Sequence, residues 1–449
     1  MKGGSRDTPA RVIGSYYAVA GLYTLSAAMI WGVNTLFLLD AGLDIFGVFL
    51  ANGAFTAGMV VFEIPTGVLA DTRGRRVSFL LSVGILIFTT VAYVAVARSG
   101  GSLLAFVATS VVMGLGFTFY SGAVEAWLVD ALRETGFTGA LDSVSARGAM
   151  VTGAAMLVGT VSGGLLGSVD LALPYVVRAG MLVVVFIVAA MVMRDLGFTP
   201  RALQLTALPR EMRAVARASI AFGWQRPSMR LLMLCSAIQG GFLSWSFYAW
   251  QPYFLELLGR DEVWIAGVVA ALVSASMIVG NALTDWLTRF CGKRSTLMLW
   301  AAGAQAVAAI GVGLAGSFWV AVALLLVVTG AVGVAGPVKQ AYMHQIVPSE
   351  HRASVISFNS LVANAGGVGA QGGLGYLARA RSIGEGYVVG GLATVLALPV
   401  LLLLRGLRED ADKIVGVRAG RPAACAAQGI PEVGGVDATP RQPVGGARG

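Results

Sequence analysis

Long apolar runs alternate with short charged segments along almost the whole chain. Each run holds about 20 residues or more, which is the length a helix needs to cross a bilayer core of about 30 Å. The pattern predicts an all-α polytopic membrane protein with twelve transmembrane helices. The predicted helices cover residues 14–38, 45–70, 77–97, 102–131, 144–168, 174–193, 229–257, 263–287, 295–315, 318–346, 353–377 and 386–405.

The predicted loops differ in charge on the two sides of the membrane. Lysine and arginine are concentrated in the loops 71–76, 132–143, 194–228, 288–294 and 347–352, whereas the opposite loops hold only Arg98, Arg260, Arg379 and Arg381. Loops rich in basic residues remain in the cytoplasm. We therefore expect both termini to be cytoplasmic, in a multi-pass protein of the bacterial plasma membrane.

The composition excludes several classes of protein. Only 12% of residues are charged and 57% are hydrophobic, whereas a soluble domain carries about 25% charged residues. The net charge of +9 is explained by arginines beside the membrane, so we expect no nucleic-acid partner. The cysteines and histidines form no metal or disulfide pattern. No phosphate-binding loop or catalytic triad is present, and we expect neither a cofactor nor enzymatic activity.

The two halves of the chain carry related segments. In the first half, the related positions are Leu69, Asp71 and the group Gly74 to Arg76. They align with Leu283, Asp285 and the group Gly292 to Arg294 if the turn in the second half is allowed to be longer. Glu125 to Leu128 aligns with Gln340 to Met343 at a similar offset. Two coincidences at one offset indicate a duplicated six-helix unit. We predict an N-terminal half at 1–193, a cytoplasmic linker at 194–228, a C-terminal half at 229–405 and a disordered tail at 406–449.

The string Gly67-Val68-Leu69-Ala70-Asp71-Thr72-Arg73-Gly74-Arg75-Arg76 lies between the second and third predicted helices. It resembles the signature of the major facilitator superfamily at this place, except that Thr72 stands where a basic residue is usual. The resemblance covers roughly residues 14–405. It implies two parallel six-helix halves with a binding site between them near the midplane, and secondary transport by alternating access.

The resemblance also implies a cytoplasmic gate made of Gly67, Asp71, Gly74, Arg75 and Asp130. Asp71 would meet the amino end of the helix that begins near 352–354, because a helix amino end attracts a carboxylate. Arg75 would pair with Asp130 in the outward-open state. A solvated surface pair is the alternative interpretation.

Ionisable residues inside apolar runs are functional candidates, and the runs contain Glu63, Glu125, Asp130, Arg178, Asp285 and Lys339. Glu125 and Glu63 are the candidates for proton coupling, because a carboxylic acid in a low-dielectric segment favours its neutral form. For Glu63, a role in the gate is the stronger hypothesis. Glu125 could instead form a static bridge with Lys339 or Arg147. The segments around Phe62 to Gly67 and Ser121 to Leu128 resemble bacterial efflux-type members of the superfamily.

Aromatic and polar residues in the helices that line the cavity of this superfamily are candidates for substrate contact. An aromatic wall suits apolar or cationic organic molecules, although some of these rings could serve only as packing. The candidates are Phe117, Tyr120, Trp245, Tyr248, Lys339 and Gln340.

These observations favour a proton-coupled exporter of small amphipathic molecules, similar to drug/proton antiporters. The segment Gly159 to Gly167 lacks the proline that antiporters often carry there. A metabolite or nutrient importer and a transporter-like sensor without transport are the alternatives. The expected partners are a small-molecule substrate, protons and the lipid bilayer, and we expect a monomer.

Overall fold

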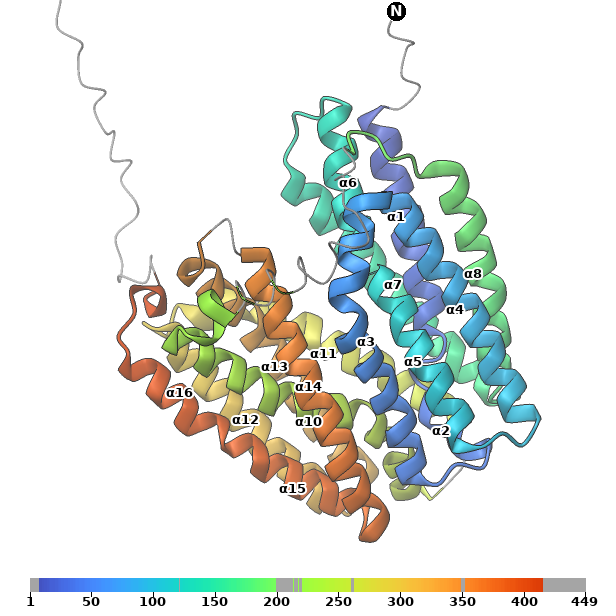
Figure 1. The fold of residues 1–449 in the computed structure, drawn as a ribbon. Helices are drawn as coiled ribbons and strands as arrows, with labels where there is room; N and C mark the ends of the chain where they lie inside the picture. The colour runs from blue at the N-terminus through green and yellow to red at the C-terminus, as the bar shows by residue number, and fades with distance from the viewer. Residues whose placement is uncertain are drawn as a thin grey trace, which may run out of the picture.

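The computed structural model describes residues 8–120, 122–198, 213, 217, 220–259, 262–348 and 352–414. The first half contains eight α-helices, which end before the predicted linker (Figure 1). They are α1 (Pro9–Ala28), α2 (Asn34–Asp40), α3 (Ile45–Arg73), α4 (Arg75–Arg98), α5 (Leu103–Tyr120), α6 (Ala123–Glu134), α7 (Leu141–Gly167) and α8 (Leu173–Val192).

The second half begins after a short π-helical turn, η2 (Ile220–Trp224), and ends with a 3-10 turn, η4 (Asp410–Asp412). Its α-helices are α10 (Pro227–Leu258), α11 (Val263–Thr288), α12 (Arg294–Leu314), α13 (Phe318–Ile346), α14 (Arg352–Ala380), α15 (Ile383–Val395) and α16 (Ala397–Gly406). The predicted all-α fold is confirmed, and every predicted transmembrane segment coincides with a helix or a pair of helices.

Ten spans within the described residues are long and apolar enough to cross a membrane. The other two predicted crossings differ for identifiable reasons. The first is interrupted between α1 and α2, and α14 is rich in glycine, asparagine and serine. Large apolar side chains such as Phe88, Trp300 and Trp319 are exposed on the outside of the bundles, as expected for a surface that contacts lipid.

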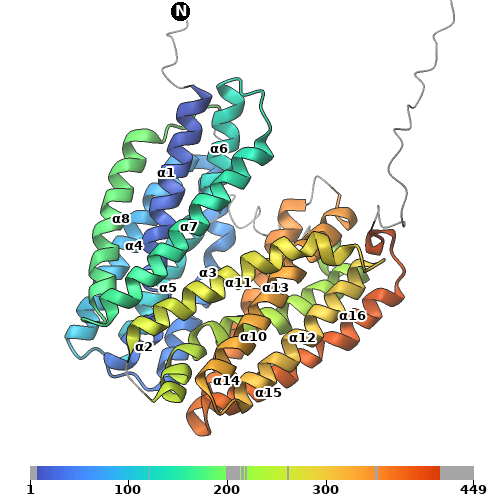
Figure 2. The same cartoon turned by 180° about the vertical axis from the view of Figure 1, so that it is seen from behind.

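The two halves form separate bundles that meet at one end of the molecule. Figures 1 and 2 show them diverging toward the end at which α1 begins, and we call it the arginine-rich end because α3 ends there at Arg73 and α4 begins there with Arg75 and Arg76. At the opposite end, Arg379 Nε lies 3.0 Å from Asp44 Oδ2 across the two halves. A Cβ on Gly164 of α7 would lie 2.7 Å from Cα of Gly267 of α11. The described halves are therefore closed at the opposite end.

The first transmembrane segment is broken at residues 29–33, where the chain forms turns between α1 and α2. Gln251 of α10 fills this break. Its side-chain amide donates to the Trp31 carbonyl at 2.8 Å and accepts from the Thr35 backbone N–H at 2.9 Å. Broken membrane helices need such partners, because no water satisfies their backbone groups in lipid.

The predicted helix 102–131 is also broken, between α5 and α6. Gly122 adopts a left-handed conformation with φ of 73°, which a residue without a Cβ reaches at little cost. The hydroxyl of Ser78 on α4 donates to the freed carbonyl of Phe119 at 2.9 Å. The break places Glu125 in the first turn of α6.

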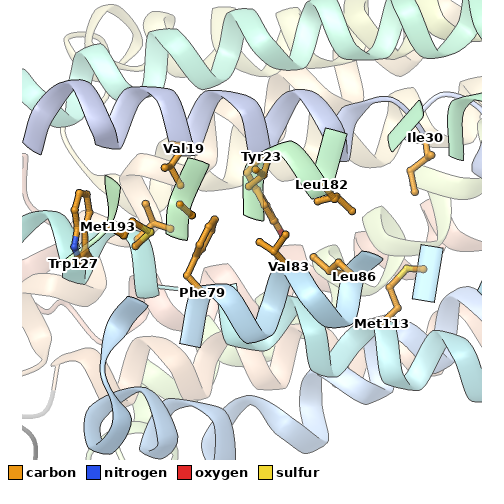
Figure 3. Close-up of a cluster of buried hydrophobic side chains, with 14 of the residues drawn as sticks. Val19, Tyr23, Ile30, Phe79, Val83, Leu86, Met113, Trp127, Leu182 and Met193 are labelled. Atoms are coloured by element: carbon orange, nitrogen blue, oxygen red, sulfur yellow. The ribbon is translucent and has the colours of Figure 1, made fainter. Parts of the chain in front are cut away.

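Large apolar and aromatic side chains from several helices, among them α1, α4, α5, α6 and α8, fill the core of the N-terminal half. Close packing of this kind holds membrane helices together, because lipid provides no hydrophobic driving force between them. Figure 3 shows the cluster between the helices. Its labelled members are Val19, Tyr23, Ile30, Phe79, Val83, Leu86, Met113, Trp127, Leu182 and Met193.

The end of the second half corrects one prediction. Residues 406–414 were expected to belong to a disordered tail, but they pack against the C-terminal half. Asp412 is 2% exposed, and Lys413 forms an isolated antiparallel bridge with Lys293. Residues 415–449 and most of the predicted linker lie outside the described residues.

Candidate functional site

Among the described residues, each of three cavities is lined by a charged residue from an apolar run of the sequence. The Arg178 cavity has a volume of about 220 Å³ and lies between the halves, since α10 contributes two of its residues. Aromatic and amide side chains make up most of its wall. It is lined by Tyr23, Ala27, Ile30, Trp31, Asn34, Asn52, Phe55, Met59, Leu86, Tyr93, Met113, Phe117, Arg178, Phe247 and Tyr248.

Arg178 of α8 is 6% exposed. Its Nε is buried without a hydrogen-bond partner, and no ion pair of Arg178 occurs among the described residues. Its electrostatic neighbours are the phenol groups of Tyr23, Tyr93 and Tyr175. A guanidinium group in a low-dielectric site is costly unless it is paired. Arg178 is thus the most unusual polar group of the described membrane interior.

A chain of hydrogen bonds supports the wall beside Arg178. Tyr175 Oη donates to Asn34 Oδ1 at 2.7 Å, and Asn34 Nδ2 donates to Asn52 Oδ1 at 2.9 Å. Asn52 Nδ2 in turn donates to the Val48 carbonyl at 3.0 Å. Each amide is satisfied by the next, which fixes its orientation. The break after α1 brings Asn34 to this position at the start of α2.

The Lys339 cavity lies entirely within the C-terminal half and has a volume of about 150 Å³. Lys339 of α13 donates to Ser236 Oγ at 3.1 Å, and Ser236 donates to Asn359 Oδ1 at 2.8 Å. Gln239 and Gln305 also line this cavity and share a hydrogen bond of 3.2 Å. Lys339 is therefore held by a neutral hydroxyl, and its partner is not Glu125.

The Glu125 cavity has a volume of about 410 Å³. It is lined by α1, α5, α6 and α7 of the first half and by Ile278 of α11. Glu125 itself is exposed, and its electrostatic neighbours include Tyr16 and Tyr120. Tyr120 stacks on Tyr23 with ring centroids 3.8 Å apart. This stacked pair separates the Glu125 cavity from the Arg178 cavity, because one ring lines each.

Glu63 lies on α3, two residues before Pro65. Its side chain is half-buried, and it lines none of these three cavities. Within the described part of the chain, no side chain is hydrogen-bonded to its carboxylate. Its role stays a prediction.

The signature turn is built around a residue that the sequence analysis missed. Asp195, just after α8, accepts a hydrogen bond from the Arg76 backbone N–H at 2.9 Å and so caps α4. Gly74 has φ of 105°, and a Cβ there would overlap with Asp195 Oδ2. Gly74 is thus required for two reasons: its backbone conformation favours glycine, and the Asp195 carboxylate occupies the space where a Cβ would lie.

The second half repeats this cap. Asp412 accepts from the Ser295 backbone N–H at 2.7 Å and from its hydroxyl at 2.8 Å, at the start of α12. Arg76 and Ser295 are both the second residue of their helices. An acid that follows the last helix of each half therefore caps the helix after the signature turn. The two caps support the internal repeat. They also shift the alignment of the two halves by one residue here, so that Arg294 corresponds to Arg75 rather than to Arg76.

Two of the contacts predicted for the gate do not form among the described residues. Gly67 is exposed, and a Cβ added to it would meet no described atom within 4 Å. No ion pair joins Arg75 to Asp130 in the described structure. Both contacts were expected for the state that is closed at the arginine-rich end, which is open here. The side chains of Asp71 and of residues 352–354 lie outside the described part, so the Asp71 contact stays a prediction.

The cavity candidates fall in different places. Phe117 and Tyr248 line the Arg178 cavity, and Tyr120 lines the Glu125 cavity. Trp245 does not line a described cavity: it is 0% exposed and packs against Phe49 and Tyr387. Its assignment to the cavity wall is therefore corrected to core packing. Gln340 is exposed and lines none of the three cavities.

Arg178 and Asn52 are the site residues to which the sequence analysis assigned no specific role. Arg178 was visible as a charge inside an apolar run, and the rule that such charges mark functional sites applies to it as well as to Glu125. Asn52 carried no comparable signal, because its contact with Asn34 depends on the break after α1.

Comparisons with known proteins agree with this architecture. A family model described as the Major Facilitator Superfamily matches residues 16–294 and 265–432. No curated protein sequence matches the chain. Among solved structures, the nucleoside transporter NupG is similar with a TM-score of 0.72 and 11% identity, covering 88% of this chain and 99% of that one.

Two other solved structures share the fold. A POT family transporter in complex with 5-aminolevulinic acid has a TM-score of 0.69 and 13% identity, covering 91% of this chain and 98% of that one. A D-xylose-proton symporter has a TM-score of 0.66 and 14% identity, covering 88% and 97%. The family match extends over most of the sequence, and the architecture is that of its structural neighbours. The chain therefore belongs to the major facilitator superfamily.

Proposed function

We propose that this protein is a secondary active transporter that exports a small amphipathic organic molecule in exchange for protons. The observation that carries the proposal is the position of the Arg178 cavity, which is walled by both halves beside their closed end. A site between two rocking halves is exposed to one side of the membrane at a time. Its aromatic wall, which includes Phe117 and Tyr248, suits an apolar molecular body.

The arginine-rich end faces the cytoplasm in this proposal, as the distribution of basic loops indicates. The structure then represents the inward-open conformation, and both termini are cytoplasmic. The Gly67 to Arg76 turn would meet the second half only in the outward-open conformation. This assignment accounts for the open space around Gly67 in the described state.

Glu125 is the proposed proton carrier. In this conformation its carboxylate is exposed in the largest of the three cavities. Closing the arginine-rich end would bring α11 toward α7 and remove water from that cavity. A carboxylate that loses water favours its protonated form, so the movement of the halves and the binding of a proton are coupled. Glu63, half-buried on α3, is the second candidate.

Import is the second candidate function, and a specific observation favours it. The cavities contain Asn34, Asn52, Gln239 and Gln305, which is more polar than the sequence analysis expected. Polar walls suit a hydrophilic metabolite, and the structural neighbours include a nucleoside transporter and a proton symporter. The direction of proton coupling distinguishes the two functions.

Proteoliposomes that contain the purified full-length protein test the proposal. A library of labelled amphipathic compounds is presented with an imposed proton gradient of either sign, or with none. We expect accumulation of at least one compound in the compartment from which protons leave. Accumulation on the side that protons enter would establish symport and support import, and the absence of transport for every compound would contradict the proposed function.

Glu125→Gln tests the coupling. The variant should lose accumulation against a gradient while retaining exchange of substrate between the two sides, because only the titrating group is removed. Glu134→Gln is the matched control, since Glu134 is exposed at the far end of the same helix. If Glu125→Gln accumulates substrate with the pH profile of the parent, Glu125 is not the coupling acid.

A further inference from the structure

Arg178 carries a permanent positive charge in a place where little compensates it. Its side chain is 94% buried, the complement of its 6% exposure, and its guanidinium lines the cavity between the halves. An arginine remains protonated in proteins, so burial cannot remove the charge. Truly buried charges are paired or hydrogen-bonded in stable structures. Over the part of the chain that the structure describes, no carboxylate pairs with Arg178.

The surroundings of Arg178 do not supply the missing partner. Its electrostatic neighbours are neutral phenols, those of Tyr23, Tyr93 and Tyr175. Tyr175 uses its proton for Asn34, and Tyr93 shares a hydrogen bond with Ser110. The two asparagines of the wall are joined to each other. The buried Nε of Arg178 is left without an acceptor.

We propose that Arg178 binds the anionic group of the transported substrate, and that this substrate is an organic monocarboxylate with an aromatic or other apolar body. The carboxylate would pair with the guanidinium, and the body would lie against Phe117, Phe247 and Tyr248. This inference rests on the proposed function, because it names the substrate class of the same site. The aromatic residues alone suggested an apolar or cationic substrate, and the inference keeps the apolar body but replaces the cationic group by an anionic one.

The size and charge of the cavity favour a carboxylate over a phosphate. A carboxylate carries one negative charge and matches a guanidinium in a two-point contact. The Arg178 cavity contains this single cation, while Lys339 lines a different cavity. A dianionic phosphate would be left half-neutralised. The volume of about 220 Å³ is smaller than the roughly 300–1,000 Å³ of typical drug-sized pockets, which favours a small molecule.

Binding to the purified full-length protein tests the inference without requiring transport. The probes are benzoate, phenylacetate and phenylpropionate, each compared with its primary amide, which has the same shape and no charge. Inorganic phosphate is a further probe. We expect at least one acid to bind roughly tenfold or more tightly than its amide, because charge-assisted hydrogen bonds are stronger than neutral ones. Phosphate should bind more weakly than that acid.

Arg178→Gln should reduce the preference for the acid over the amide to about one, while the amide retains its affinity. Arg178→Lys keeps the charge but lacks the planar fork, so it should retain part of the preference for the acid. If Arg178→Gln does not fold, this partial loss in Arg178→Lys tests the role of the guanidinium group. Arg98→Gln is the matched control, because Arg98 is exposed at the end of α4. Its preference should equal that of the parent.

Several outcomes would overturn the inference. These are equal or absent binding of every acid and amide pair, a preference that survives in folded Arg178→Gln, and stronger binding of phosphate than of any acid. The failure of the proposed function has a different signature. If an acid binds through Arg178 but is never transported, the anion site is supported and the transport function is contradicted. If only neutral compounds are transported, the transport function is supported and the anion site is contradicted.

Discussion

The side-chain amide of Gln251 replaces the backbone hydrogen bond that Thr35 would make in an unbroken helix. In such a helix the Thr35 N–H would bond to the Trp31 carbonyl, four residues earlier. Gln251 instead accepts from Thr35 at 2.9 Å and donates to Trp31 at 2.8 Å. Because Gln251 belongs to the C-terminal half, the same contact repairs the break after α1 and holds the two halves together at their closed end.

The first prediction concerns this contact. Gln251→Leu should shift the protein away from the conformation described here, because both backbone groups lose their partner. A buried donor or acceptor left unsatisfied costs about 1–3 kcal/mol. We expect a corresponding shift toward the outward-open state, measured as increased labelling of a cysteine placed at the closed end.

Gln345→Leu is the control for that experiment. Gln345 is exposed and accepts a single hydrogen bond from Arg294, so the same substitution there should leave labelling unchanged. Equal labelling in the parent and in Gln251→Leu would show that the amide does not hold the closed end.

The second prediction concerns the two helix caps. Asp195→Ala and Asp412→Ala should each lower stability by about 1 kcal/mol, the typical effect of removing an N-cap. The caps lie in different halves, so the two effects should add. Thermal unfolding of the single and double variants in one detergent measures this.

Asp410→Ala provides the comparison for the caps, because Asp410 is exposed and pairs only with Lys413 at the surface. Its unfolding temperature should match that of the parent. Strongly non-additive effects of the two cap variants would contradict the view that each cap serves its own half.

The third prediction separates the two glycines of the signature. Gly74→Ala should destabilise the protein by about 1–3 kcal/mol, because only glycine tolerates its backbone conformation and Asp195 occupies the space. Gly67→Leu should leave the unfolding temperature unchanged, since no described atom lies within 4 Å of a Cβ at this position.

Gly67→Leu should nevertheless abolish transport, because the larger side chain would obstruct the approach of the second half when the arginine-rich end closes. Transport assays and unfolding temperatures on the same preparations provide the measurement. Normal transport in a well-expressed Gly67→Leu variant would show that no close contact forms there.

The fourth prediction assigns different effects to two aromatic residues of α10. Trp245→Ala should reduce stability by about 3–5 kcal/mol, as expected when a fully buried ring is removed. Tyr248→Ala should change which compounds bind, with a much smaller effect on stability, because its ring lines the Arg178 cavity.

Trp300→Ala is the control for the loss of a large ring, since Trp300 is 73% exposed on the outside of the bundle. Unfolding temperatures and a ligand-binding panel on all three variants separate the roles. An unchanged binding profile in Tyr248→Ala would assign that ring to packing alone.

The fold could be predicted from the sequence because hydrophobic length is a strong signal in membrane proteins. The breaks were not predicted, because they depend on distant partners. The gap after α1 is supported by Gln251, which is 216 residues from Thr35, and the left-handed Gly122 is supported by Ser78. A window that averages hydropathy cannot detect either partner.

The candidate site was only partly predictable for a related reason. Charges inside apolar runs identified Glu125, Lys339 and Arg178 as unusual, but the sequence does not show which of them meet. Trp245 and Tyr248 are three residues apart on one helix, yet one is in the core and the other faces the cavity. The rotation of α10 against its neighbours decides this difference, and it depends on packing rather than on local sequence.

The caps at Asp195 and Asp412 also bear on the order in which the protein is made. Each cap closes its half by joining the segment after the last helix to the helix that follows the signature turn. Asp195 is synthesised before any helix of the second half. The first half can therefore complete its own fold during translation, whereas the cap of the second half forms only when synthesis has passed Asp412.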